Sequence, residues 1–147
     1  LDHYLRLTPL DWIDAFQTAR RASLARAAAA EKKQAEARAR GTRPSLSPEG
    51  YAGEYADSWY GKAIIRGENG KLVLSMARTP SMVAELDHWH HDTFLARWRD
   101  NTIPDAFVTF SLGRDGKVDQ MTMAAVSSLA DFSFDYHDLL FRPTRKP

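Results

Sequence analysis

The sequence predicts a mainly β fold, in which eight antiparallel strands form a sandwich or a barrel after one long N-terminal α-helix. Up to residue 46 the chain is rich in alanine and spaces its apolar residues helically, whereas from Tyr51 onward short aromatic and β-branched runs alternate with turn residues. With 147 residues, 44% of them apolar, 27% charged and none of them cysteine, the chain fits one globular unit with its own core.

The helix is expected over about residues 9–40. Thr8-Pro9-Leu10-Asp11 supplies a cap residue, a proline at the first helical position and a carboxylate in the first turn. Gly41 and Pro44 favour an end soon after Arg40. Such a helix is about 48 Å long, whereas the rest of the chain has a radius of gyration of about 13 Å. We therefore expect it either to bend or pack on another domain or subunit, or to be a solvated linker helix. Its apolar stripe is formed by Trp12, Ile13, Phe16, Ala19 and Leu24.

Eight runs after Pro48 have the composition of strands. Glu68-Asn69-Gly70 and Arg114-Asp115-Gly116 are hairpin signals, because these residue types adopt positive φ at low cost. The expected strands are Tyr51–Ala56, Trp59–Arg66, Lys71–Ala77, Met82–His90, Phe94–Arg99, Ala106–Leu112, Lys117–Val126 and Phe132–Phe141.

Alternation along these strands predicts which side chains face inward. An eight-stranded barrel has an interior that side chains just fill or that holds one small ligand. The inner-face candidates are Leu72, Leu74 and Met76, then Met82, Ala84 and Leu86, and in the last strand Phe132, Phe134 and Tyr136.

The run His88-Trp89-His90-His91-Asp92 stands out most among the metal-ligating residue types of the chain. On a strand, His88 and His90 point to one face, so they are weak candidates for a zinc-like site with His137 or a carboxylate as third ligand. Histidines that only hydrogen-bond beside Trp89 are the preferred interpretation, and the expected metal and cofactor content is none.

A three-residue turn over His91-Asp92-Thr93 would set the register of this hairpin. It would pair His90 with Phe94, His88 with Ala96 and Leu86 with Trp98, which keeps one mixed apolar face continuous.

Small-molecule binding is a second interpretation of the aromatic residues. Tyr51-Ala-Gly-Glu-Tyr and Trp59-Tyr-Gly fit aromatic packing at a barrel corner, where glycine lets strands approach closely. If a cavity is present instead, the candidate ligand-binding residues are Trp59, Tyr60, His88, His90 and Trp98.

Several function classes find no support. The chain has no Gly-x-Ser-x-Gly, no Ser-x-x-Lys and no cysteine, so we expect no catalytic residue in it. Residues 1–46 contain nine Lys/Arg and five Asp/Glu, a net charge of +4, and residues 47–147 contain eleven Lys/Arg and fourteen Asp/Glu, a net charge of −3. This charge asymmetry is too small to indicate nucleic-acid binding. No apolar run reaches a membrane span's length. Because the chain starts at Leu1 without Met, we expect an upstream part.

Five segments carry a family resemblance: Tyr51-Ala-Gly-Glu-Tyr, Trp59-Tyr-Gly, Leu86-Asp-His-Trp-His-His-Asp-Thr-Phe94, Asp105-Ala-Phe-Val-Thr-Phe110 and Leu129-Ala-Asp-Phe-Ser-Phe134. Over residues 46–142 the chain resembles the lipocalin-like domain of unknown function that lies C-terminal to serine β-lactamase-fold hydrolases. The preceding residues are similar to the linker that joins that domain to the catalytic one. His91 departs from the pattern, since an aromatic such as Tyr is expected there.

The resemblance implies a helical linker or docking segment at residues 1–46 and an eight-stranded lipocalin-like barrel at 47–147. It implies a non-catalytic accessory domain of a penicillin-binding-protein-like peptidase or esterase, which shapes access to the active site or assembly. The expected partner is the parent's catalytic domain, within one subunit or between subunits, and a homo-oligomer through the N-terminal helix is also expected. A periplasmic or secreted location follows from the same resemblance. The alternative is a small hydrophobic-ligand-binding module.

Overall fold

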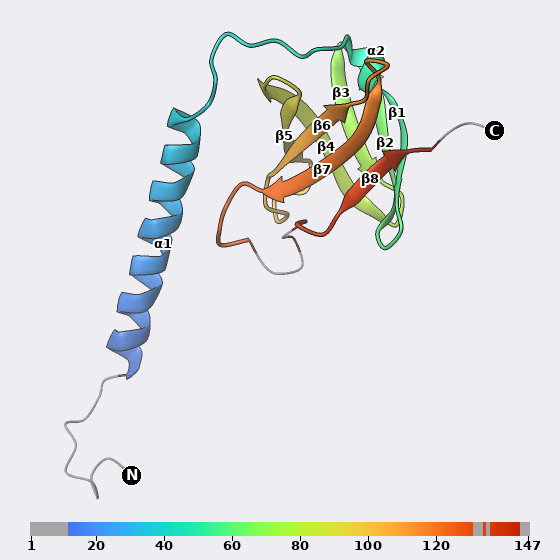
Figure 1. Cartoon of the computed structure of the whole chain (residues 1–147). Coiled ribbons are helices and arrows are strands. Elements are labelled where there is room, and N and C mark those ends of the chain that lie inside the picture. Colours follow the sequence, from blue (N-terminus) through green and yellow to red (C-terminus); the bar gives the residue numbers. More distant parts are fainter. Residues whose placement is uncertain (1–11, 131–133, 135, 145–147) are drawn as a thin grey trace, which may run out of the picture.

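The computed structural model describes residues 12–130, 134 and 136–144 (Figure 1). Helix α1 (Trp12–Glu36) leads through a linker, residues 37–47, to the short helix α2 (Pro48–Tyr51) and then to eight strands. This order confirms the predicted class, a mainly β chain with one long helix before the strands. The strands are β1 (Gly53–Asp57), β2 (Gly61–Glu68), β3 (Lys71–Met76), β4 (Thr79–His90), β5 (Thr93–Trp98), β6 (Ala106–Leu112), β7 (Val118–Ala125) and β8 (Leu140–Pro143).

The strands form a closed antiparallel barrel, not a sandwich. The barrel closes where β8 pairs with β1, through Tyr55 with Pro143 and Ala56 with Arg142. Because each strand runs antiparallel to the one before it, successive connections lie at alternate ends of the barrel. The upper end in Figure 1 holds the β2–β3, β4–β5 and β6–β7 turns, and the lower end holds the other connections. The predicted hairpins are confirmed, with positive φ at Asn69, Gly70 and Gly116.

Side chains fill the interior of the barrel. The predicted inner faces of β3 and β4 are confirmed, since none of their six inward side chains is more than 4% exposed. The ring of Tyr51, supplied by α2, lies at the upper end and packs 5.3 Å from the ring of Phe94 and 4.9 Å from that of Phe110. The six inward side chains are Leu72, Leu74, Met76, Met82, Ala84 and Leu86.

The last strand is shorter than predicted and starts later. Strand β8 covers residues 140–143, so among the described residues it shares only 140 and 141 with the expected range 132–141; Phe134 lies in a single 3-10 turn, and Phe132 lies outside the described residues. Tyr136 is buried as expected, but its φ of 57° is incompatible with a strand. Its hydroxyl has no hydrogen-bond partner among the residues that the structure describes.

Asp57 ties the start of β8 to the β1–β2 turn. Its carboxylate accepts the N–H groups of Trp59 at 2.7 Å, Tyr60 at 2.8 Å and Leu140 at 3.0 Å, and the residue is only 8% exposed. Burial acts to raise the pKa of this carboxyl, but the three backbone donors outweigh burial and hold the pKa below its ordinary value. Asp57 therefore stays charged and helps to close the barrel.

Helix α1 ends at Glu36, four residues before the predicted end. The reason lies in Arg38 and Ala39, which turn toward the β4–β5 turn and bond to it instead of continuing the helix. The predicted start at Thr8-Pro9 lies outside the described residues. The structure thus separates α1 from the barrel by an extended linker (Figure 1).

The predicted register of the β4–β5 hairpin is wrong by two residues. His88 pairs with Phe94, Leu86 with Ala96 and Ala84 with Trp98, and the connection is the two-residue turn His91-Asp92. The two-residue turn is possible because His91 adopts a φ of 45°. The pairing register shifts between His88 and His90, as at a β-bulge. The observed and predicted registers differ by an even number of residues, so each side chain still lies on the predicted face of the sheet.

Candidate functional site: a clamp between the linker and the β4–β5 turn

The linker binds along the β4–β5 turn through a set of contacts that we call the linker clamp. It joins Arg38, Ala39, Thr42 and Ser45 of the linker to residues 88–92 of the hairpin. At the helix end, Arg38 donates from Nε to the Trp89 carbonyl at 2.6 Å and from Nη2 to the His88 carbonyl at 3.1 Å. These bonds fix where the chain leaves α1.

Arg38 also stacks on an aromatic pair outside the barrel. Its guanidinium carbon lies 4.6 Å from the centre of the Trp89 ring, which is in turn 5.1 Å from the ring of Phe107. Phe107 points outward from β6, yet only 9% of it is exposed. A cation over an aromatic face contributes about 1 kcal/mol, so the stack adds to the hydrogen bonds of Arg38.

Two hydrogen bonds form the middle of the linker clamp. The N–H of Ala39 donates to Nδ1 of His90 at 3.3 Å, and the N–H of His91 donates to Oγ1 of Thr42 at 3.0 Å. The pKa of His90 is lowered by burial and by the nearby charges of His91, Arg38 and His88. The neutral imidazole that can accept this bond is therefore the favoured form.

Asp92 anchors the far end of the linker clamp. Its carboxylate accepts the N–H and the hydroxyl of Ser45, each at 2.8 Å, and a short hydrogen bond from the hydroxyl of Tyr51. The Tyr51 hydroxyl accepts from the N–H of Leu46 at 3.1 Å. One carboxylate thus connects the turn, the linker and the aromatic core.

Both titratable groups of this anchor are shifted. Burial acts to raise the pKa of Asp92, but donation from Tyr51 and Ser45, together with the nearby charge of His91, leaves the pKa below its ordinary value. Burial and, as the second largest cause, the hydrogen bond to Asp92 raise the pKa of Tyr51 to about 12. The pair therefore consists of a carboxylate and a neutral phenol over a wide pH range.

The five predicted ligand-binding residues do not meet at one place. Trp59 is 87% exposed and, with Tyr60, lies in the β1–β2 turn at the lower end, whereas His88 and His90 approach the upper end. Tyr60 donates from its hydroxyl to Sδ of Met82 at 3.2 Å. Trp98 is buried and donates from its indole N–H to the Pro104 carbonyl at 3.0 Å.

The two histidines that were candidate metal ligands are both hydrogen-bonded. His88 donates from Nε2 to the His91 carbonyl at 3.0 Å, and His90 accepts from Ala39. Within the part of the chain that the structure describes, no three His, Cys, Asp or Glu side chains are grouped so that they could hold a metal ion. His137 follows β7 and lies at the lower end.

A groove of about 240 Å³ lies beside the linker clamp at the upper end. It includes His88 but none of the other predicted ligand-binding residues. Its lining is mainly apolar and is supplied by the linker, α2 and strands β3 to β5, with Leu46, Tyr51, Leu72, Leu86, His88 and Phe94 among its residues.

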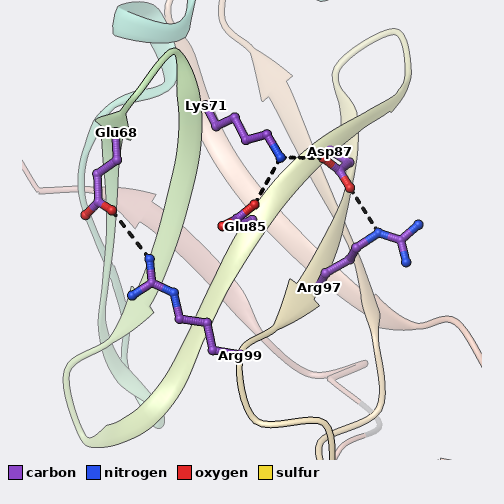
Figure 2. Close-up of polar contacts among 6 residues, drawn as sticks. All are labelled: Glu68, Lys71, Glu85, Asp87, Arg97 and Arg99. Carbon is purple, nitrogen blue, oxygen red and sulfur yellow. Dashed lines mark hydrogen bonds and ion pairs between the residues drawn. The ribbon is translucent and has the colours of Figure 1, made fainter.

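The outer face of β2 to β5 carries charges of both signs in register (Figure 2). Lys71 is 3.0 Å from Glu85 and 3.8 Å from Asp87, and Arg97 donates to Asp87 at 2.9 Å. Arg99 and Glu68 form a further pair at 3.4 Å. All of these side chains are about half exposed, so each pair adds little stability. Paired charges give this face no basic stripe of the kind that binds nucleic acid.

One side of α1 changes from exposed to buried along the length of the helix. Trp12 and Phe16 are 70% and 68% exposed, whereas Ala27, on the same side of the helix, is 3% exposed. Toward its end, the same side faces residues 125–130 across a cavity of about 550 Å³, which Ala30, Gln34 and Ala37 help to line. Figure 1 shows the first half of α1 extending past the lower end of the barrel. Among the described residues, no helix has the length and apolar character to cross a membrane.

Sequence reasoning missed the residues that organise this site. The sequence places Arg38 inside the predicted helix and Asp92 in the predicted turn, and it indicates no role for Asp57. Asp57 was recognisable in part, since an Asp two residues before an exposed backbone N–H commonly accepts from it. The partners of Arg38 and Asp92 lie about fifty residues away along the chain, and no local signal indicates them.

Comparison with known proteins gives one match. The family model described as "Domain of unknown function (DUF3471)" matches residues 37–143. No curated protein and no solved structure matches the chain. The matched region begins at Ala37, so it includes the linker clamp together with the barrel and leaves out α1.

Proposed function

This chain belongs to the DUF3471 family, and we propose that it is a non-catalytic accessory domain of a serine β-lactamase-fold hydrolase of the peptidase or esterase class. In this proposal the nucleophile lies in a separate catalytic domain of the parent. The barrel shapes access to the active site or joins subunits, and α1 is the element that docks on the catalytic domain.

The exposed first half of α1 carries the proposal. Burying Trp12 and Phe16 against a partner removes two large aromatic side chains from water, and each contributes about 2 kcal/mol. The linker clamp holds the other end of the helix at the barrel, and the first half of α1 extends past the lower end of the barrel (Figure 1). The catalytic domain is the proposed occupant because the resemblance places it before this helix in the chain.

The filled interior supports an accessory module over a carrier of small hydrophobic molecules. A carrier needs a lumen, and here the inward side chains of β3 and β4 and the ring of Tyr51 occupy it. The absence of Ser-x-x-Lys and of cysteine from the chain supports a nucleophile supplied from elsewhere.

Removing the barrel from the parent enzyme tests this function. We expect deletion of residues 47–147 to change kcat/KM for bulky substrates by about tenfold, or to change the oligomeric state, because a cover or an intersubunit contact is lost. A parent carrying Arg114→Ala, in the exposed β6–β7 turn, should behave like the unmodified enzyme. Unchanged kinetics, substrate range and assembly after the deletion contradict the proposal.

A further inference from the structure

We propose that the linker clamp is a pH-sensitive latch, in which protonation of His90 breaks its bond with Ala39, repels Arg38 and so loosens α1 while the Asp92 end of the linker stays bound. The inference rests on contacts within this chain alone. It holds whether or not the chain serves a hydrolase.

The hydrogen bond between Ala39 and His90 requires a neutral imidazole. The backbone N–H of Ala39 can only donate, so Nδ1 of His90 must be unprotonated and the ring proton must sit on Nε2. A protonated ring carries N–H groups on both nitrogens, and Nδ1–H would then face the N–H of Ala39. Protonation therefore turns an attractive contact into a repulsive one.

The charges around His90 increase this effect. Arg38 faces it from the linker, His88 from β4, and His91 from the turn, where the two rings are 5.5 Å apart. The carboxylate of Asp92 is the nearby acid, and it is already bonded to Ser45 and Tyr51. The other residues around the adjoining cavity of about 320 Å³ do not titrate in this range: Gln34, Ala37, Trp89, Thr93, Phe107, Thr109 and Ala124.

The other contacts respond differently to acid. His88 donates to a carbonyl, so its hydrogen bond survives protonation. Asp92 keeps its charge at pH 5.5, because its pKa lies below the ordinary aspartate value. The pKa of His90 is also lowered, so the latch opens below the ordinary histidine value of about 6.5. Acid therefore loosens the helix end of the linker selectively.

Release of this end leaves α1 free to reorient. Cavities of about 550 and 320 Å³ lie between the last two turns of α1 and the barrel, so this end of the helix, beyond the buried Ala27, is loosely packed. Losing one hydrogen bond and adding like-charge repulsion shifts the equilibrium toward the open form by about tenfold.

Spin-label distances test the latch directly, since the chain lacks cysteine and any pair can be introduced. Ala29→Cys on α1 with Ala77→Cys in the β3–β4 turn reports the helix, and Ala52→Cys with Ala77→Cys reports the barrel; all three positions are exposed. Between about pH 8 and pH 5.5, we expect the first distance distribution to broaden and the second to stay narrow.

Three variants identify the group responsible. H90N keeps an acceptor near the Nδ1 position but does not titrate, so its helix distance should stay narrow at both pH values. H90F has no acceptor, so its helix distance distribution should be broad at both pH values. H88Q should respond like the unmodified chain. An unmodified chain without a response, an H90N chain that broadens, an H90F chain that stays narrow or an H88Q chain without a response overturns the latch.

Discussion

We expect Asp57→Ala to lower the free energy of unfolding by about 3 kcal/mol. The substitution leaves the N–H groups of Trp59, Tyr60 and Leu140 without their acceptor at the seam where β8 closes the barrel. Urea denaturation followed by tryptophan fluorescence measures the change. Asp115→Ala is the matched control, because this carboxylate accepts from one backbone N–H in an exposed turn. Equal losses for both variants would show that Asp57 has no special part in closure.

The same variant changes the pH dependence of stability. The folded pKa of Asp57 lies below its ordinary value, so its stabilisation is present above the ordinary aspartate pKa and is lost as pH falls through the folded pKa. Asp57→Ala should therefore flatten the decline of the unfolding free energy below about pH 4. If the unfolding free energy of the variant declines as steeply as that of the unmodified chain, other carboxylates cause the loss of stability in acid.

Asp92→Ala should cost about 2 kcal/mol and free the far end of the linker. Its loss removes the acceptor for two groups of Ser45 and for the hydroxyl of Tyr51. The pKa of Tyr51 should fall from about 12 toward its ordinary value of 10, with burial keeping it higher, and ultraviolet absorbance of tyrosinate measures this.

Asp100→Ala is the control for this experiment. Asp100 also accepts an N–H and a hydroxyl, both from Thr102, but at an exposed site that does not touch the linker. It should leave the tyrosine titration unchanged. An Asp92→Ala chain with normal stability and an unshifted Tyr51 pKa would show that this anchor does not form in solution.

The barrel was predictable because its information is local. Alternation placed Leu74 and Met82 inside, and the dipeptides Asn69-Gly70 and Asp115-Gly116 placed two hairpins. The β4–β5 register was missed because His91 occupies positive φ, which its residue type does not indicate.

The candidate site was harder to predict than the fold. Arg38 has helix propensity and lies next to a helix, yet long-range bonds to the carbonyls of His88 and Trp89 decide its conformation. Propensity carries no information about such partners. The His-rich run stands out in the sequence, but its contacts with the linker depend on the assembled barrel.

We propose that the exposed side of α1 docks on the catalytic domain of a parent hydrolase. Measuring kcat/KM and the oligomeric state of the parent with Phe16→Asp, against Ala25→Asp at an exposed position on the opposite side of α1, tests this docking. We predict that Phe16→Asp reproduces the effect of deleting residues 47–147, because a buried carboxylate abolishes docking, and that Ala25→Asp has no effect. A Phe16→Asp parent that matches the unmodified enzyme in both measurements would contradict the claim.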